Sequence, residues 1–234
     1  MSGPKLAPHL LALDLDGTLV DSAPDIAHCL GRAMEAVGFE APGEPRTRVW
    51  IGDGLETTIA RALAHSAQDE ARAPGQALRA DERQAAALRA FLNCYRDNLF
   101  VRSRLYPGVV ETLDALRERG VTLCCITNKR FAFSDALLRQ AGVRDRFALV
   151  LGGDSLPEKK PSPMPLLAAV EQLGVAASAA VLVGDSHQDL RAARAAGYGF
   201  ILAVYGYGKV DETEAAAAPR IRRFADLLEL LEAT

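Results

Sequence analysis

The chain carries the stretch Leu10-Leu-Ala-Leu-Asp14-Leu-Asp16-Gly-Thr-Leu-Val-Asp21, a short apolar run that ends in acid-x-acid-Gly-Thr. The pattern is typical of a buried strand that breaks into a loop. Side chains two residues apart leave a strand on the same face, so Asp14 and Asp16 should present two carboxylates toward one small volume. Two such charges repel, so either one keeps its proton or a cation lies between them. A hard divalent ion such as Mg2+ would suit; a plain strand end whose acids cap a turn is the alternative.

The segment after this stretch carries helical patterns. In residues 24–37 apolar side chains recur every three to four positions, with Ser22 as a candidate N-cap. A Pro/Gly-rich link is predicted over residues 41–45. Further helices are predicted from Leu55 and along an apolar stripe within residues 88–99, with a loop around Ala73-Pro-Gly75 between them. Residues 22–105 are therefore predicted to be all-helical.

From residue 106 onward helices alternate with short apolar strands. Strands are predicted within residues 121–126, 148–151, 180–183 and 200–204. Helices are predicted over about residues 134–140, 163–173 and 190–196, with a final helix within residues 224–231. Continuously apolar strands form a parallel sheet with both faces covered, and the strand from Leu10 belongs with them. The predicted fold class is α/β, a doubly wound parallel sheet core with an inserted all-helical cap. Residues 1–21 and 106–234 would form the core and residues 22–105 the cap.

Ligands of open parallel sheets bind beyond the carboxyl ends of the strands, where the strand order reverses. In this chain those ends carry acids, hydroxyl and amide groups, and lysines: Asp14, Asp16, Thr18, Thr127, Asn128, Lys129, Asp154, Lys159, Lys160, Asp185 and Asp189. That inventory favours phosphoryl transfer, in which positioning and charge neutralisation do most of the catalysis. Simpler alternatives are that Asn128 and Lys129 cap the next helix and that Asp189 is a first-turn acid.

The composition is that of a soluble globular protein. Of the 234 residues 49% are hydrophobic and 24% charged, and the formal net charge is -3. That charge gives no general attraction to nucleic acid or to an anionic membrane. No apolar run approaches the roughly 20 residues that span a bilayer, and the N-terminus lacks a signal pattern, so we expect a cytoplasmic location. All four cysteines are expected to be buried thiols: Cys29, Cys94, Cys124 and Cys125.

Four segments resemble the ordered motifs of the haloacid dehalogenase superfamily. They are Asp14-Leu-Asp-Gly-Thr-Leu-Val-Asp-Ser, Ile126-Thr-Asn-Lys, Lys160-Pro-Ser-Pro and Val183-Gly-Asp-Ser-His-Gln-Asp. The resemblance covers nearly the whole chain and implies a Rossmann-like core with a cap. The segments Trp50-Ile-Gly-Asp-Gly54, Gly152-Gly-Asp and Tyr205-Gly-Tyr-Gly208 further resemble the bacterial phosphoglycolate phosphatases of that superfamily.

The resemblance implies a catalytic role for three residues. Asp14 would be the nucleophile that forms an aspartyl-phosphate intermediate. Asp16 would protonate the leaving alkoxide and later accept a proton from the hydrolytic water. Lys160 would neutralise the charge of the intermediate. It is chosen over Lys159 because the family lysine directly precedes proline.

The resemblance also implies a Mg2+ site and a phosphate site. The ion would be bound by Asp14, by the backbone carbonyl of Asp16 and by Asp185. Asp189 would orient this shell or replace a ligand through water. The phosphate-binding residues would be Thr18, Thr127 and the backbone amide of Asn128.

One loop of the inserted segment is predicted to bind substrate. Gly52 and Gly54 flank Asp53, which favours a loop whose backbone approaches a ligand, with plain cap core as the alternative. A small carboxylate on the leaving group should meet backbone amides or an arginine. The sequence does not choose among six candidates: Arg46, Arg48, Arg61, Arg96, Arg102 and Arg104. The late tyrosines Tyr205 and Tyr207 are interpreted as a packed turn at the sheet edge.

Particular residues narrow the reaction within the resembled superfamily. The dehalogenases lack an acid at the position of Asp16, no lysine occurs between Asp21 and Pro107 to form a Schiff base, and Ile26 stands where phosphohexomutases carry a histidine. The resemblance thus implies a Mg2+-dependent hydrolase of 2-phosphoglycolate. We expect a monomer or homodimer, and the net charge and the lack of a long apolar run predict no nucleic-acid or membrane partner. Another small phosphate ester (a sugar phosphate or nucleotide) or pyrophosphate is the alternative substrate. A phospho-acceptor signalling module without turnover is the alternative of another class.

Overall fold

The computed structural model describes residues 7–70 and 79–231, and the chain divides into two compact units. The core unit comprises residues 1–21 and 104–234, and the helical unit comprises residues 22–103. The loop predicted around Ala73-Pro-Gly75 lies outside the described residues. Within the described ranges, every helix is too short or too polar to cross a membrane. The use of residues 22–105 as a substrate cap stays a prediction.

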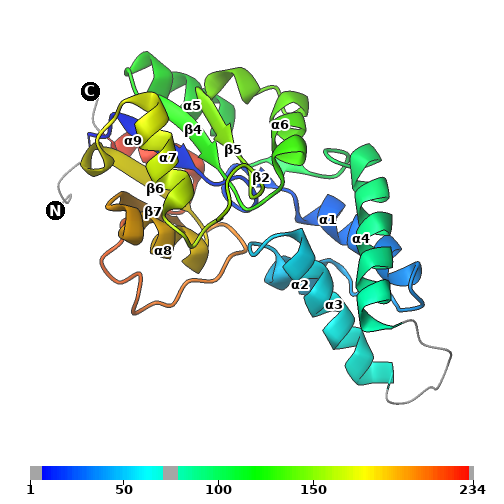
Figure 1. Ribbon diagram of the computed structural model, residues 1–234. Helices are drawn as coiled ribbons and strands as arrows, with labels where there is room; N and C mark the ends of the chain where they lie inside the picture. The colour runs from blue at the N-terminus through cyan, green and yellow to red at the C-terminus, as the bar shows by residue number, and fades with distance from the viewer. Residues whose placement is uncertain (1–6, 71–78, 232–234) are drawn as a thin grey trace. The chain divides into compact units, whose positions relative to one another are not determined.

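The core unit is built on a six-stranded sheet of order β5-β4-β1-β6-β7-β8 (Figure 1). All five neighbouring pairs are parallel, and β1 lies between β4 and β6. The strand order therefore reverses at β1, whose carboxyl end is the expected ligand position. The strands are β1 (Leu10–Leu13), β4 (Thr122–Ile126), β5 (Leu149–Leu151), β6 (Ala180–Gly184), β7 (Gly199–Ala203) and β8 (Arg220–Ile221).

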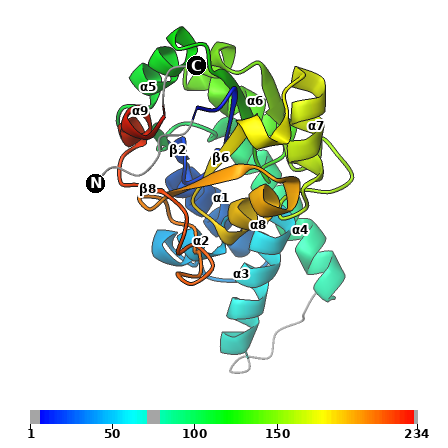
Figure 2. The ribbon, with the colours of Figure 1, turned by 90° about the vertical axis from the view of Figure 1, so that its left-hand side faces the viewer.

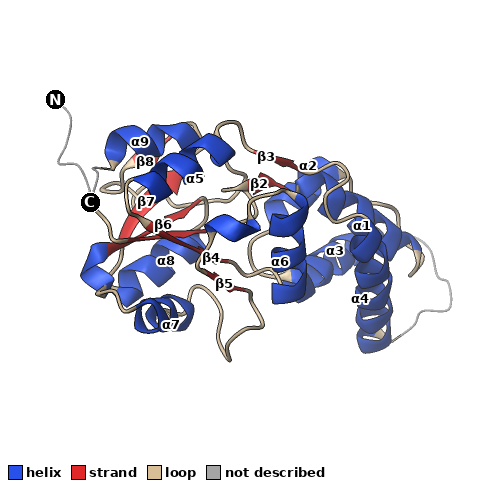
Figure 3. Ribbon diagram, turned by 90° about the horizontal axis from the view of Figure 1, so that it is seen from above, coloured by secondary structure: helices blue, strands red, loops and turns tan. Residues whose placement is uncertain are grey.

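Helices cover both faces of this sheet. Figure 3 shows α5 and α9 on one side and α7 and α8 on the other. Leu10 of β1 packs with Leu166 of α7 and Leu190 of α8 in one hydrophobic cluster. All four residues of β1 are fully buried, as expected for a strand covered on both faces. The predicted doubly wound fold is confirmed. The helices are α5 (Val109–Glu118), α6 (Phe131–Gln140), α7 (Met164–Leu173), α8 (His187–Ala196) and α9 (Leu227–Leu230).

Several short elements escape the sequence pattern. The strand β8 and the antiparallel pair β2 (Val20–Asp21) and β3 (Arg104–Leu105) have two residues each, too few to show a periodicity. The helices α6 and α8 begin three residues earlier than predicted. The described residues of the core unit also contain three 3-10 turns: η1 (Arg144–Arg146), η2 (Ala177–Ala179) and η3 (Phe224–Asp226). The last of them replaces the start of the predicted final helix.

The helical unit contains four helices within its described residues: α1 (Ala23–Glu35), α2 (Glu44–Trp50), α3 (Leu55–Glu70) and α4 (Ala80–Asp97). Helix α1 packs against α2 and α4, and Figures 1 and 2 show α3 beside α4. Helix α2 begins within the segment expected to be a Pro/Gly-rich link. Pro45 does not prevent this, because proline is accepted in the first turn of a helix. Ser22 precedes α1 but makes no side-chain cap, since its backbone is already helical, with φ -96° and ψ -5°.

A disulfide joins two helices of this unit. Cys29 of α1 and Cys94 of α4 are bonded, with their Cα atoms 5.4 Å apart. The expectation of a buried thiol is therefore wrong at both positions. Each cysteine fits its own helical pattern, and only the packing of α1 against α4 brings the two together. Cys124 and Cys125 of β4 are free and buried as expected, and burial raises the pKa of Cys124 to about 12.

One buried aspartate ties the beginning of the helical unit to its end. The carboxylate of Asp25 accepts hydrogen bonds from the N–H groups of Val101, Arg102 and Ser103 at 2.8 to 3.0 Å, and from the Ser103 hydroxyl at 2.7 Å. Burial opposes ionisation, but these donors hold the pKa of Asp25 below its ordinary value. The start of α1 is thus fixed to the last residues of the unit.

Candidate active site

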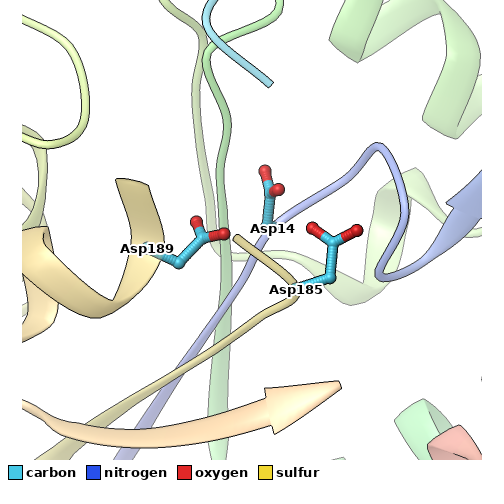
Figure 4. Close-up of side chains that lie close together, drawn as sticks. All are labelled: Asp14, Asp185 and Asp189. Atoms are coloured by element: carbon cyan, nitrogen blue, oxygen red, sulfur yellow. The ribbon is translucent and has the colours of Figure 1, made fainter. Parts of the chain in front are cut away.

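Three aspartates gather at the carboxyl ends of β1 and β6 (Figure 4). Asp14 follows β1, Asp185 follows β6, and Asp189 lies in the first turn of α8. One oxygen of each carboxylate lies within 4.8 Å of the other two. The residues are 8%, 4% and 0% exposed, so this is a buried group of acids rather than a solvated surface cluster.

The turn after β1 depends on a glycine. The Asp14 N–H donates to the carbonyl of Val183 on β6 at 3.0 Å, and the Gly17 N–H donates to Val20 at 2.9 Å. Gly17 has a φ of 85°, and a Cβ on it would overlap the carboxylate of Asp185. Glycine meets both requirements, so the acid-x-acid-Gly pattern lets the two acidic loops approach each other.

A second loop, residues 205–208, holds Asp185. Its Oδ2 accepts hydrogen bonds from the backbone N–H groups of Tyr207 at 3.0 Å and Gly208 at 2.7 Å. A Cβ on Gly206 or Gly208 would overlap Asp185, so the loop can close on the carboxylate only with glycine at both positions. Sequence reasoning missed this function of the loop, because the contact joins residues distant in the chain.

The side chain of Tyr205 in this loop is packed, as the sequence predicts. Its ring lies 4.7 Å from that of Tyr106, and its hydroxyl donates to the carbonyl of Thr18 at 2.8 Å. Thr18 is fully buried, and its hydroxyl oxygen has no hydrogen-bond partner within the described part of the chain. Contact between Thr18 and phosphate stays a prediction.

Asp189 is engaged through both of its oxygens. Oδ2 accepts from the N–H of Ser186 at 3.1 Å and from its hydroxyl at 2.5 Å, while Oδ1 accepts from Lys160 at 2.6 Å. A Cβ on Gly184 would overlap the side chain of Asp189, so that glycine admits it against β6. Asp189 is thus a first-turn acid, as the simpler alternative held, and also a member of the acidic cluster.

Lys160 joins two members of the cluster, Asp14 and Asp189, and is 2% exposed. The Nζ atom lies 2.9 Å from Asp14 Oδ1 and 2.6 Å from both Asp189 Oδ1 and the carbonyl of Ile126. Although burial opposes its charge, the carboxylates of Asp14 and Asp189 raise the pKa of Lys160 above its ordinary value. The alternative that Lys159 and Lys160 form a solvated pair is therefore wrong for Lys160, which is buried. Lys159 is half-buried.

Burial dominates the electrostatics of the acids. It raises the pKa of Asp14 to about 7, against the opposing effect of Lys160 and together with repulsion from Asp189 and Asp16. Burial and repulsion from Asp14 and Asp189 also raise the pKa of Asp185 well above its ordinary value. The two carboxylates therefore resist carrying their charges together unless further positive charge is present.

The donor set fits a divalent cation. Within residues 7–70 and 79–231, Oδ2 of Asp14 and Oδ1 of Asp185 have no hydrogen-bond partner. Hard divalent cations prefer carboxylate oxygens, and a cation beside these atoms would let both buried acids ionise. The acidic cluster is thus compatible with a divalent metal.

Asp16 points toward a lysine that sequence reasoning left as a helix cap. Lys129 Nζ lies 2.9 Å from each carboxylate oxygen of Asp16. The cap of α6 is formed elsewhere, because the Phe131 N–H donates to Asp154 Oδ1 at 2.7 Å. The ion pair joins two strand ends, and the local sequence around Lys129 carries no signal for it.

Two of the residues predicted to hold phosphate, Thr127 and Asn128, follow β4. Thr127 and Asn128 are 4% and 8% exposed. The side-chain amide of Asn128 donates to the carbonyl of Lys160 at 2.9 Å. This bond joins the second motif to the third. The structure therefore brings Asp14, Thr127, Asn128, Lys160, Asp185 and Asp189 to one edge of the sheet.

The predicted ligand loop of the helical unit is bound to α3. The carbonyls of Trp50 and Gly54 each accept from the Thr58 hydroxyl at 3.1 Å, and Asp53 pairs with Arg61. Gly52 and Gly54 both have positive φ, at 121° and 93°. The loop is therefore well fixed within its own unit, and a substrate contact by Gly52, Asp53 or Gly54 stays a prediction.

Several of the six candidate arginines pair with acids. Arg48 lies 2.7 Å from Glu44, Arg61 pairs with Asp53, and Arg102 lies 3.4 Å from Asp25. The other three are exposed: Arg46, Arg96 and Arg104. The structure does not single out one of them as the substrate-binding arginine.

Known proteins resemble this chain across most of its length. The family model of haloacid dehalogenase-like hydrolases matches residues 11–203. A phosphoglycolate phosphatase of Nitrosococcus oceani is 42% identical over 200 residues, 86% of this chain and 85% of that protein. The phosphoglycolate phosphatase of Chromobacterium violaceum is 38% identical over 222 residues, 95% of this chain and 96% of that protein. The crystal structure of a predicted phosphoglycolate phosphatase from Haemophilus somnus has a TM-score of 0.87 and 34% identity, covering 94% of this chain and 96% of that one.

Proposed function

This chain belongs to the haloacid dehalogenase-like hydrolase family, and we propose that it is a Mg2+-dependent phosphatase that hydrolyses 2-phosphoglycolate to glycolate and phosphate. The observation that carries the proposal is the buried contact of Asp14 with Lys160 beside Asp185 and Asp189. Phosphoglycolate phosphatases 42% and 38% identical to the chain support the substrate. Membership in a hydrolase family argues against a phospho-acceptor module without turnover.

In the first step an oxygen of Asp14 bonds to phosphorus while the bond between phosphorus and the glycolate oxygen breaks. Asp16 donates a proton to that oxygen, so glycolate leaves as an alcohol. Lys160 lies 2.9 Å from Asp14 Oδ1, where it fixes the nucleophile and offsets the negative charge of the phosphoryl group.

In the second step water attacks the phosphorus of the aspartyl-phosphate. Asp16, now a carboxylate, accepts a proton from this water. The bond between phosphorus and Asp14 breaks, which releases inorganic phosphate and restores the Asp14 carboxylate. The proton given to glycolate is thereby recovered from water, and both acids return to their starting states.

The residues that would hold Mg2+ are Asp14, Asp185 and the backbone carbonyl of Asp16. Asp189 would orient the site, because its two oxygens already contact Ser186 and Lys160. The bound ion would supply positive charge to the phosphoryl oxygens. The buried carboxylates of Asp14 and Asp185 support this assignment, since their pKa values are raised when no cation is bound.

The phosphoryl group would be held by three further residues of the core unit. The Thr127 hydroxyl and the backbone amide of Asn128 would donate to its oxygens, together with Thr18. A cap formed by residues 22–105 would enclose the substrate and contact the leaving group through Gly52, Asp53 and Gly54. Since the Asp53 carboxylate is paired with Arg61, the loop would offer its backbone amides.

We place the protein in the cytoplasm as a monomer or homodimer with no nucleic-acid or membrane partner. Its proposed substrate is a small, multiply charged ester, which does not cross a bilayer and stays in the compartment where it is made. Size-exclusion chromatography with light scattering distinguishes the two oligomeric states.

A substrate panel with Mg2+ tests the proposed function. We expect kcat/KM for 2-phosphoglycolate to exceed that for sugar phosphates, nucleotides and pyrophosphate by about tenfold or more. A much higher value for any of these other substrates would overturn the assignment of 2-phosphoglycolate.

Two further measurements test the mechanism. EDTA and Asp14→Asn should each abolish turnover, and retained activity in Asp14→Asn would refute the nucleophile assignment. Asp16→Ala should still allow slow phosphorylation of Asp14, which mass spectrometry detects as a covalent phosphoprotein. Rapid multiple turnover by Asp16→Ala would contradict the proton-transfer role.

A further inference from the structure

Lys129 is a nearly buried lysine of the core unit to which the steps above give no role. Its Nζ lies 2.9 Å from both Oδ1 and Oδ2 of Asp16, and the two side chains are 7% and 12% exposed. The ammonium group is therefore directed at the residue that exchanges protons with the leaving group.

The two lysines thus contact different acids of the site. Lys160 contacts Asp14, Asp189 and the carbonyl of Ile126, so its charge lies on the side of the nucleophile. Lys129 lies on the side of Asp16, where the leaving group must be placed for protonation.

The backbone around Lys129 is fixed. Its N–H donates to the Thr127 hydroxyl at 3.2 Å, and its carbonyl accepts from the Gly153 N–H at 2.7 Å. A Cβ on Gly153 would overlap the carbonyl of Asn128, so the glycine permits this close approach. A charged side chain on a rigid backbone can recognise a group that arrives in one position.

The leaving group of the proposed substrate lies within reach of this ammonium. Asp16 must lie within ~2.7 Å of the ester oxygen to protonate it. With 2.9 Å between Asp16 Oδ1 and Lys129 Nζ, the ester oxygen lies at most roughly 6 Å from the ammonium. The carboxylate oxygens of glycolate lie about 3 Å from that ester oxygen. An ammonium to carboxylate hydrogen bond of ~2.8 Å closes the remaining distance.

We propose that Lys129 binds the carboxylate of the leaving group, and so selects phosphate esters whose alcohol carries an acid next to the ester carbon. An Asp16 oxygen that turns to the ester oxygen gives up a bond to Lys129, and the substrate carboxylate takes its place. The inference rests on the proposed function, since it names the residue that recognises glycolate.

Kinetics with two esters test this role. Ethyl phosphate has the same two-carbon leaving group as 2-phosphoglycolate but no carboxylate. We expect Lys129→Met to lower kcat/KM for 2-phosphoglycolate by about 100-fold and for ethyl phosphate by less than about fivefold, with Lys129→Arg retaining part of the preference. Lys159→Met is the matched control and should change neither value.

Binding supplies a readout independent of turnover. In the Asp14→Asn background, calorimetry should show that Lys129→Met weakens the binding of 2-phosphoglycolate by about tenfold or more. The affinity for inorganic phosphate should be unchanged. Unchanged phosphate binding also shows that the variant is folded; if it is lost, Lys129→Gln is judged by the same two ligands.

The outcomes separate the two proposals. Equal losses on both esters, with unchanged binding of 2-phosphoglycolate, would overturn the role of Lys129 and leave the proposed function standing. A wild-type enzyme that does not prefer 2-phosphoglycolate to ethyl phosphate would overturn the proposed function and this inference together.

Discussion

The two units bury aspartates with opposite results. In the core unit, burial raises the pKa of Asp14 to about 7, because Lys160 does not compensate for the loss of water and for the neighbouring acids. In the helical unit, Asp25 is fully buried as well, yet its pKa is lowered by donors from residues 101–103. A buried acid with all its partners inside the protein is structural. One that still needs positive charge marks a place for a ligand.

Removing the counter-ion of Asp14 should break the core arrangement most severely. We expect Lys160→Ala to lower kcat/KM by about 1000-fold, since it leaves buried carboxylates without their cation. The neighbouring Lys159→Ala is the matched control, with an expected loss of less than about threefold. Steady-state kinetics on 2-phosphoglycolate measures both, and equal losses would undo the choice of Lys160.

A pair of glycines tests whether the acidic loops of the core must touch. Gly17→Ala would push a methyl group into Asp185, so we expect Mg2+ affinity to fall by about 100-fold. Gly52 of the helical unit also has a positive φ but has open space around its Cβ position. Gly52→Ala should cost about 1 kcal/mol of stability and leave Mg2+ binding unchanged. Mg2+ titration followed by calorimetry distinguishes the two, and equal affinities would contradict the contact.

The disulfide offers a way to weaken only the helical unit. Reduction of Cys29–Cys94, or the variant Cys29→Ser/Cys94→Ser, should lower the free energy of unfolding of that unit by about 2–4 kcal/mol. Denaturant unfolding with and without dithiothreitol measures the effect, and the double variant should not respond to the reductant. Mg2+ binding by the core acids should persist, because none of them belongs to the helical unit. A parallel loss of stability and Mg2+ binding would contradict this expectation.

The opposite pKa shifts predict opposite responses to pH. Asp14 holds its proton more tightly in the folded, metal-free protein, because its pKa is raised from 3.8 to about 7. The contribution of Asp14 to the stability of the metal-free protein should therefore fall as the pH rises from 3.8 to about 7. Below about pH 7, Mg2+ should bind about tenfold more weakly for each pH unit. Asp25 has a lowered pKa, so the stability that it contributes is lost only as the pH falls below the ordinary pKa of an aspartate. A Mg2+ affinity independent of pH from 5 to 8 would contradict the shift of Asp14.

The sheet and its strand ends could be predicted because their signals are local. Buried strands such as β1 and β6 are continuously apolar, and a polar residue marks where each one ends. Asp14, Thr127 and Asp185 follow such strands directly, so the topology of a parallel sheet is enough to bring them to one edge. The strand β8 gives no such signal, because a strand of two residues is too short to show a pattern.

What could not be predicted depends on contacts between distant parts of the chain. Lys129 meets Asp16 across 113 positions, and the N–H groups of Tyr207 and Gly208 meet Asp185 from another loop. Cys29 and Cys94 are 65 residues apart. In each case the local sequence fits an ordinary helix, cap or turn, and only the packing of elements reveals the contact.

The short ribbon of β2 and β3 brings the two ends of the insertion together. Val20 pairs with Leu105 and Asp21 with Arg104, so the chain leaves the sheet and returns to it through adjacent residues. Within the helical unit, Asp25 near the first end accepts a hydrogen bond from the N–H of Ser103 at the second end. The two chain segments that lead into and out of the helical unit are therefore adjacent within the core unit. A tight turn between Asp21 and Arg104 could stand in place of the helical unit, and other folded modules could be exchanged there without altering the register of the sheet.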